Sequence, residues 1–259
     1  MPEGPEIRIM SNFIKEKTEH KLFKKMFDVQ KENTEYENHI IKDFYIYSQS
    51  NGKLLTLSFY NEENHIDIDF FMGMSGNWVF VPTYKWDSIR FVRFRVDSDD
   101  GMSLVLYGGY LGPKYKIGGF DTKRGPDPIK YFEDFKLNIL SNLDKKVFQL
   151  PIYEALLNQE YFGGVGNYIR STILFYLNEN PFQKAKDFII KRPEIIDMCR
   201  DIQIKSYKLN GGQLKDWKNP NDSDSNEFLK WVFYQKGNHL KDSDNRTFWY
   251  DPKWEKFKK

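Results

Sequence analysis

The sequence has one cysteine, Cys199, among 259 residues. One thiol forms no internal disulfide and cannot supply the several cysteine ligands of a structural zinc site. The histidines are equally sparse, and no two stand at ligand spacing: His20, His39, His65 and His239. We therefore expect no metal, no cofactor and a reducing, intracellular setting.

Long apolar runs and a large net charge are also missing. No apolar stretch approaches the ~18 residues of a membrane span, and the start lacks a signal-peptide pattern, so we expect a soluble protein without a membrane partner. The net charge is only +2 and gives no global signal for nucleic acid. Residues 230–259 hold eight basic residues against four acidic ones, which fits a solvated tail or a polyanion site equally well.

Aromatic residues are abundant, at 17%, and recur along the whole chain. Residues 5–19 have apolar positions at helical spacing, with Pro5 suited to the first helical position. From about residue 20 to 117 the pattern alternates as in strands. One hairpin is expected about Asn51-Gly52, and a second turns at residues 98–101. In "HIDIDFFM", Asp67 and Asp69 are expected to face outward.

Residues 118–130 are rich in glycine and proline and predict a linker. Beyond it, "VFQLPIYEALLNQEY" and "GNYIRSTILFYL" predict two helices, "NEFLKWVFYQ" a short one and "RTFWYDPKW" a terminal β-hairpin. The fold class is therefore α+β with two domains. A β-sandwich with an N-terminal helix spans residues 1–117, and a largely helical domain spans 131–259.

The opening "MPEGPEIRIM" admits two interpretations. Proline and glutamate are good first-turn residues, so the stretch can be a plain helix start, with Glu6 capping it and orienting the terminus. Alternatively, removal of Met1 exposes the secondary amine of Pro2, part of which is neutral and nucleophilic at physiological pH. Glu3 would then lie beside it as a proton carrier.

Three further motifs are ambiguous when taken alone. "FGGVGN" is a tight turn between helices, or a phosphate clamp formed by backbone amides and Asn167. Met74 in "GMSG" is a buried thioether, or a wedge that fills the space left by an extruded base. Arg246 at the tip of the terminal hairpin is a surface arginine, or a bidentate phosphate ligand.

The order of the motifs is more specific than any one of them. "PEGPE", "GK", "GMSG", "RGPDP", "LLNQ…GGVGNYIR" and "NRTFWY" follow one another as they do in the formamidopyrimidine-DNA glycosylase/endonuclease VIII family. The resemblance covers nearly the whole chain, and the chain looks most like the vertebrate endonuclease VIII-like glycosylases that lack zinc.

This resemblance implies a bifunctional DNA glycosylase and abasic-site lyase of base-excision repair. Pro2 looks like the Schiff-base nucleophile and Glu3 like the acid/base that helps to open the sugar. Lys53 in "NGKLL" is similar to a lysine that contacts DNA phosphate and assists elimination. Asn167 and Arg246 look like the phosphate ligands of the helix–two-turn–helix motif (about residues 147–178) and of the terminal finger (about 228–252).

The same resemblance adds Met74, Gly164, Gly166 and Tyr168 as DNA-binding candidates. The expected partner is double-stranded DNA with an oxidised base or an abasic site, bound by a monomer without a cofactor. The compartment would be the nucleus or another one that contains DNA if the source is eukaryotic or viral. Oxidised pyrimidines and ring-opened or hydantoin purines are favoured over 8-oxoguanine.

Two departures from the family pattern stand out. Where the family usually has an arginine and a phenylalanine on one loop, "YGGYLG" places Tyr110 and Leu111, so we expect little preference for the base opposite the lesion. The finger has no cysteine, and Phe248, Trp249 and Tyr250 are expected to supply the packing that zinc supplies elsewhere.

Two other functions stay open: a DNA-binding protein of this fold without catalysis, and an abasic-site lyase with weak base excision. A DNA-binding protein without catalysis needs no nucleophile. The presence together of Pro2, Glu3 and Lys53 therefore argues against that function. Borohydride trapping on abasic DNA, followed by an assay for free damaged base, separates the three functions.

Overall fold

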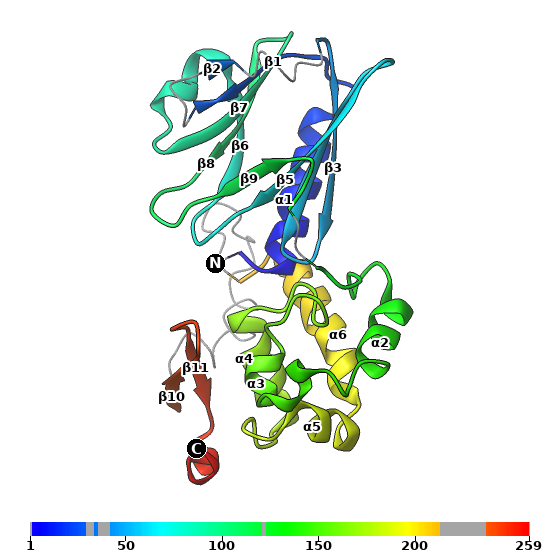
Figure 1. Ribbon diagram of the computed structural model, residues 1–259. Coiled ribbons are helices and arrows are strands. Elements are labelled where there is room, and N and C mark those ends of the chain that lie inside the picture. The colour runs from blue at the N-terminus through cyan, green and yellow to red at the C-terminus, as the bar shows by residue number, and fades with distance from the viewer. Residues whose placement is uncertain (1, 30–33, 36–41, 121–122, 213–236, 259) are drawn as a thin grey trace. The chain divides into compact units, whose positions relative to one another are not determined.

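The computed structural model describes residues 2–29, 34–35, 42–120, 123–212 and 237–258. The chain forms two compact units (Figure 1). The first comprises Met1–Pro2 and Ile7–Thr122, and the second comprises Glu3–Glu6 and Lys123–Lys259. The short helix expected at 226–235 and the first part of the expected finger lie outside the described residues.

The first unit contains two antiparallel sheets that face each other (Figure 1). One has the strand order β2-β1-β7-β8-β6 and the other β3-β4-β5-β9. Their bounds are β1 Phe23–Asp28, β2 Thr34–Glu35, β3 Tyr45–Asn51, β4 Leu54–Tyr60, β5 His65–Phe71, β6 Asn77–Pro82, β7 Val92–Ser98, β8 Met102–Tyr107 and β9 Lys114–Ile117. Helix α1, Gly4–Thr18, precedes the strands, and the 3-10 helix η2, Thr83–Ser88, follows β6.

The turns agree with the sequence pattern. Asn51 pairs with Leu54, so Gly52 and Lys53 form the two-residue turn between β3 and β4, and Gly52 has a φ of +54°. A positive φ costs glycine little, which explains the Asn-Gly pair. The second hairpin turns after Ser98, with Gly101 at φ +78°.

Aromatic side chains join the two sheets. The Phe94 ring on β7 lies 5.3 Å from that of Phe70 on β5 and 6.2 Å from that of Phe59 on β4, measured between ring centroids. Phe70 also packs edge-on against Trp78 at 5.1 Å. The three phenylalanines are fully buried, so these rings form the centre of the sandwich and contribute its main hydrophobic stabilisation.

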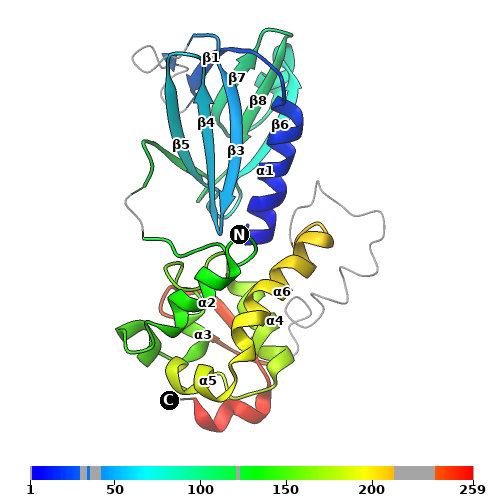
Figure 2. The same ribbon diagram turned by 90° about the vertical axis from the view of Figure 1, so that its right-hand side faces the viewer.

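The second unit has five α-helices in its described part (Figure 2). They are α2 Phe132–Leu140, α3 Ile152–Ala155, α4 Asn167–Leu177, α5 Ala185–Lys191 and α6 Glu194–Lys208, with 3-10 helices η3 Lys146–Gln149 and η4 Pro252–Phe257. They bury one continuous apolar core that includes Phe162, Ile169 and Cys199. None of the helices in the described ranges is both long and apolar enough to cross a membrane.

A two-stranded hairpin, β10 Asn238–Lys241 and β11 Thr247–Tyr250, completes the second unit. An isolated hairpin of this size is marginally stable in water and needs further packing. Phe248 and Tyr250 supply it, because both are buried in the helical core. The Phe248 ring stacks on that of Tyr153 with centroids 4.9 Å apart.

The expected α+β class, with antiparallel sheets and an N-terminal helix, is confirmed. Two local expectations were wrong. The first helix of the glycine-loop pair is a single turn, α3, because the chain turns again at Asn158, whose carbonyl accepts from Tyr161 and Phe162. Asp69 is buried instead of outward, and it accepts hydrogen bonds from Thr56 Oγ1 and from the amide of Phe120.

We expect Phe94→Ala to lower the free energy of unfolding by about 3–5 kcal/mol, because it leaves a cavity between the two sheets. Tyr84→Ala is the matched control, since Tyr84 is 77% exposed and its loss should cost under ~0.5 kcal/mol. Urea unfolding curves of the three proteins measure the difference. A Phe94 variant as stable as wild type would contradict the aromatic core.

Candidate active site

The start of helix α1 holds two buried carboxylates. Pro2 is buried and directly precedes Glu3, which is the residue before the first helical position. Glu6 reaches back from the first turn, and its Oε2 accepts from the Glu3 amide at 2.7 Å. This is half of a capping box, and it fixes the backbone of Glu3.

The Glu3 side chain binds the start of a different helix, α4. Its Oε1 accepts from the Tyr168 amide at 3.0 Å, and its Oε2 accepts from the Ile169 amide at 3.3 Å. These amides are the second and third of the helix and have no partner inside it. The N-cap residue, Gly166, has no side chain to offer, so Glu3 takes that role and its negative charge meets the positive end of the helix.

Glu6 is surrounded by hydrogen-bond donors. Its Oε1 accepts from the Tyr168 hydroxyl at 2.8 Å and from the Gly212 amide at 2.6 Å. The Tyr168 hydroxyl also pairs with Ser206 Oγ at 2.9 Å. Burial, and the charges of Glu6 and Glu3, raise the pKa of Tyr168 well above its ordinary value. The phenol therefore stays protonated and keeps its donor for Glu6.

Two glycines of "FGGVGN" make room for this arrangement. A Cβ on Gly166 would lie 2.1 Å from the Glu3 carboxyl carbon. Gly164 has a φ of +80°, and its carbonyl accepts from the Gly4 amide at 2.9 Å. The loop thus holds the first residues of α1 by close backbone approach.

This geometry changes the interpretation of the loop as a phosphate clamp. The amides of Tyr168 and Ile169 already donate to Glu3, and the Tyr168 side chain is only 3% exposed. Of the phosphate-binding groups expected in this loop, the side chain of Asn167 is therefore the one that remains a candidate. The expected DNA contacts of Gly164, Gly166 and Tyr168 stay predictions.

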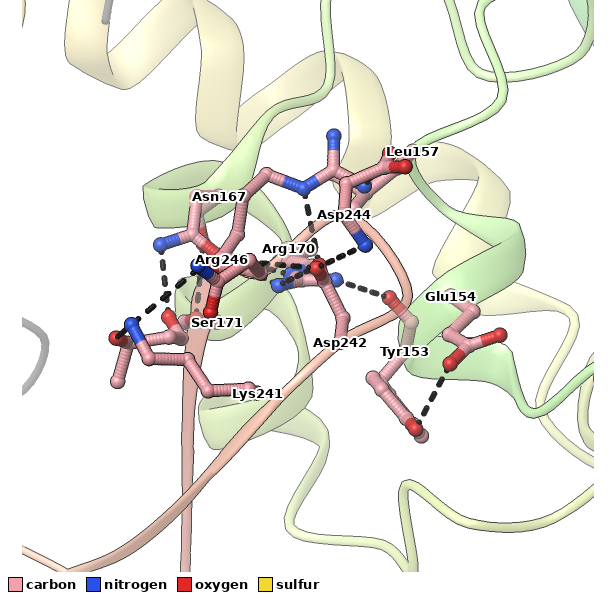
Figure 3. Close-up of polar contacts among 12 residues, drawn as sticks. Tyr153, Glu154, Leu157, Asn167, Arg170, Ser171, Lys241, Asp242, Asp244 and Arg246 are labelled. Carbon is pink, nitrogen blue, oxygen red and sulfur yellow. Dashed lines mark hydrogen bonds and ion pairs between the residues drawn. The ribbon is translucent and has the colours of Figure 1, made fainter.

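Asn167 and Arg246 are linked through two residues that the sequence pattern did not single out, Arg170 and Asp242 (Figure 3). The Asn167 Oδ1 accepts from Arg170 Nη2 at 2.7 Å, and its Nδ2 donates to the Thr247 carbonyl at 2.9 Å. Arg170 Nη2 and Arg246 Nε both donate to Asp242 Oδ2, at 2.8 and 2.9 Å. The available signal was that Arg170 is the one charged residue of the stretch "NYIRSTILFYL".

The charges of this cluster stabilise one another. Burial opposes ionisation of Asp242, but hydrogen bonds from the Arg246 backbone and side chain and from Arg170 outweigh it and hold the pKa of Asp242 below its ordinary value. Burial lowers the pKa of Arg170, and the charge of Asp242 opposes that change. An arginine stays charged under these conditions.

The remaining candidates belong to the first unit. Lys53 lies on the β3–β4 turn and is partly exposed. Met74 is 54% exposed, and its amide donates to the Leu111 carbonyl at 2.9 Å, so the "GMSG" turn and the "YGGYLG" loop are adjacent. Tyr110 is 91% exposed. In the described ranges, no group of three or more His, Cys, Asp or Glu side chains could hold a metal ion.

We expect Asp242→Asn to lower the free energy of unfolding by about 3–5 kcal/mol at neutral pH, because Arg170 loses its buried counter-charge. The folded pKa of Asp242 lies below the ordinary 3.8, so its stabilisation is present above that value and is lost as the pH falls through the folded pKa. The difference from wild type should therefore shrink below about pH 4. Urea unfolding at several pH values measures it.

Asp144→Asn is the matched control. Asp144 is paired with Lys186 but its side chain is 93% exposed, so the change should have little effect at any pH. An Asp242 variant whose deficit stays constant down to the acid limit would contradict the assigned charge.

No family model matches the chain. Human "Endonuclease 8-like 1" is 27% identical to it over 289 aligned residues, which cover 96% of this chain and 72% of the human protein. A "Formamidopyrimidine-DNA glycosylase" of Wolbachia sp. subsp. Brugia malayi is 24% identical, with 86% and 84% covered.

Solved structures agree on the fold. The wild-type Lactococcus lactis Fpg (MutM), in complex with DNA containing an oxidised pyrimidine, superimposes with a TM-score of 0.75 at 17% identity, covering 98% of this chain and 99% of that one. Relatives and fold agree: the chain is similar in sequence and in fold to proteins of the formamidopyrimidine-DNA glycosylase/endonuclease VIII family.

Proposed function

We propose that this protein is a bifunctional DNA glycosylase and abasic-site lyase that excises oxidised bases from double-stranded DNA. The observation that carries the proposal is the fixed carboxylate of Glu3. It follows Pro2 directly and is held by two backbone amides of α4, while Glu6 holds its own amide. Capping of α4 accounts for the orientation of this carboxylate, and its place beside Pro2 is what the proposed proton transfer requires.

Pro2 supplies the nucleophile once Met1 has been removed, because only then is its nitrogen an amine. The amine attacks C1′ of the damaged nucleotide, the bond from C1′ to the base breaks, and the base leaves with a proton. The nitrogen then loses its proton, O4′ gains one, and the C1′–O4′ bond breaks to give an iminium between Pro2 and C1′. The resulting iminium accepts electrons from the sugar. Loss of a proton from C2′ and then from C4′ drives two successive eliminations, which break the C3′–O and C5′–O bonds and leave a one-nucleotide gap with phosphate at both ends. Water hydrolyses the iminium, which releases the sugar remnant and restores the Pro2 amine. Glu3 moves the protons that open the sugar ring.

The phosphate ligands in this proposal are Lys53, Asn167 and Arg246. Arg246 keeps 30% of its side chain exposed at the hairpin turn. Asn167 presents its Nδ2 group toward the hairpin, where Thr247 accepts one of its two hydrogens. Phosphate contacts of this kind fix the register of a protein on the duplex and carry no sequence information.

The exposed loops of the first unit fit the space vacated by a flipped base. Met74 and Leu111 are both more than half exposed, and the backbone hydrogen bond between them keeps the two loops together. Oxidised pyrimidines and ring-opened or hydantoin purines are the proposed lesions. The DNA bound by the Lactococcus protein contains an oxidised pyrimidine, a lesion of the same group.

Borohydride trapping on a duplex with an abasic site tests the mechanism. We expect a covalent adduct with the mature chain and none with a matched chain that carries one extra residue before Pro2, because an amide has no nucleophilic lone pair. Glu3→Gln should abolish release of a damaged base yet still allow trapping, since an abasic sugar opens spontaneously. Intact-mass measurement confirms removal of Met1.

The possible outcomes separate the candidate functions. Binding without any adduct would leave a non-catalytic damaged-DNA-binding protein. An adduct without release of a free damaged base would leave an abasic-site lyase. An adduct formed by the blocked chain would contradict the role of Pro2.

Opposite-base preference tests the loop assignment. No guanidinium stands on the "YGGYLG" loop, and the nearby Arg93 donates to the carbonyls of Gly108 and Gly109. We expect excision rates opposite the four bases to agree within about threefold, because a bidentate arginine contact worth about 1–3 kcal/mol is missing. Tyr110→Arg should increase the spread. A strong preference of the wild type for cytosine would contradict the assignment.

A further inference from the structure

Arg170 is the largest fully buried side chain of the described residues, and it carries a charge. Burying a charge is costly unless it is paired and hydrogen-bonded. Four donated hydrogen bonds meet that need: Nε and Nη2 to Asn167 Oδ1, Nη1 to the Tyr153 carbonyl and Nη2 to Asp242 Oδ2. Two of the partners, Asn167 and Asp242, connect Arg170 with the candidate phosphate ligands.

The first is Asn167. A guanidinium donates and never accepts, so the Asn167 carboxamide has to turn its oxygen toward Arg170. Its NH₂ group then points to the hairpin, where the Thr247 carbonyl accepts at 2.9 Å. One N–H is used in this contact, and the orientation of the second is set as well. Arg170 thus determines that the NH₂ group of the Asn167 side chain, and not its oxygen, faces the hairpin.

The second is Arg246. Asp242 accepts from Arg170 and from Arg246 Nε through the same oxygen. Its other oxygen, Oδ1, accepts from the amides of Asp244 and Arg246 at 3.0 and 2.9 Å. The carboxylate is saturated by donors, so its position, and with it the Arg246 side chain, follows from the buried guanidinium.

We propose that Arg170 is a positioning residue that sets the geometry of both candidate phosphate ligands, Asn167 directly and Arg246 through Asp242. This inference rests on the proposed function, since it assumes that the two residues bind DNA. It assigns to Arg170 an effect on DNA binding that is separate from its effect on stability.

Arg170→Lys is the informative variant. Lysine keeps the charge but replaces the planar fork by a single ammonium, which cannot hold Asn167, Tyr153 and Asp242 in their present geometry. Arg192→Lys is the matched control in the same unit. Arg192 donates to Glu179 at 2.7 Å and to Glu194 at 2.6 Å.

The measurement is equilibrium binding to a duplex that contains a tetrahydrofuran abasic analogue, which resists cleavage, at several salt concentrations. Asn167→Ala is introduced into the wild type, into Arg170→Lys and into Arg192→Lys. We expect it to weaken binding about tenfold in the wild type and the control, but less than about twofold beside Arg170→Lys, because residues that act together are not additive.

The salt dependence gives an independent readout. Loss of one phosphate contact reduces the slope of log K against log[salt] by about 0.9. Arg170→Lys should reduce the slope as much as Arg246→Ala does, and Arg192→Lys should leave it unchanged. A purely structural role would lower the unfolding temperature without changing the slope of the folded protein.

The outcomes distinguish the two proposals. If the wild type neither binds this duplex nor traps on abasic DNA, the proposed function fails, and the role of Arg170 falls with it. If the wild type binds but the effects of Asn167→Ala and Arg170→Lys add, only the role of Arg170 is overturned.

A second variant covers a failure of Arg170→Lys to fold. Arg170→Met combined with Asp242→Met replaces the buried pair by apolar side chains, an exchange that proteins often tolerate. Near-ultraviolet circular dichroism confirms the fold. Asn167→Ala should again cost less than about twofold in this background, and a full tenfold cost there would overturn the proposal.

Discussion

Two carboxylates at the start of the chain, Glu3 and Glu6, impose the main constraint on the second unit. Both are almost fully buried, and a buried carboxylate is tolerated only where donors surround it. The donors come from distant segments: the start of α4 for Glu3, and Tyr168 with Gly212 for Glu6. The glycine at position 166 is needed because any larger residue would collide with Glu3. The same contacts that satisfy the carboxylates therefore fix where the residue after Pro2 stands.

The terminal hairpin depends on contacts with the helical core for its stability. Its four-residue strands are too short to be stable alone. Stacking of Phe248 on Tyr153 supplies apolar burial, and the Arg170–Asp242 pair supplies a directional contact. Such a pair contributes little net stability compared with an apolar substitute, because desolvation offsets the attraction. Its value lies in geometry, since hydrogen bonds define the orientation of Asn167 and Arg246 where apolar packing would not.

Local patterns in the sequence predicted the local structure well. Strand alternation, the Asn51-Gly52 turn and the first helix all depend on neighbours along the chain, and the structure confirms them. The contacts of the site could not be predicted in this way. Arg170 and Asp242 are 72 positions apart, and Glu6 and Gly212 are 206 apart, so their pairing depends on the path of the whole chain. Asp69 was misassigned for the same reason, because its donors come from a neighbouring strand and from residue 120.

One turn of α4 brings the two parts of the site together. The amides of Tyr168 and Ile169 hold the Glu3 carboxylate, while the side chains of Asn167 and Arg170 face the hairpin. The proposed proton carrier and the proposed phosphate ligands are therefore all positioned by the first turn of α4, whose backbone has few internal degrees of freedom. A force on Asn167 from a bound phosphate would act on the same backbone that positions Glu3. Under the proposed function, the position of the bound DNA and the placement of the carboxylate are thus coupled through the backbone of α4, without any need for a moving part.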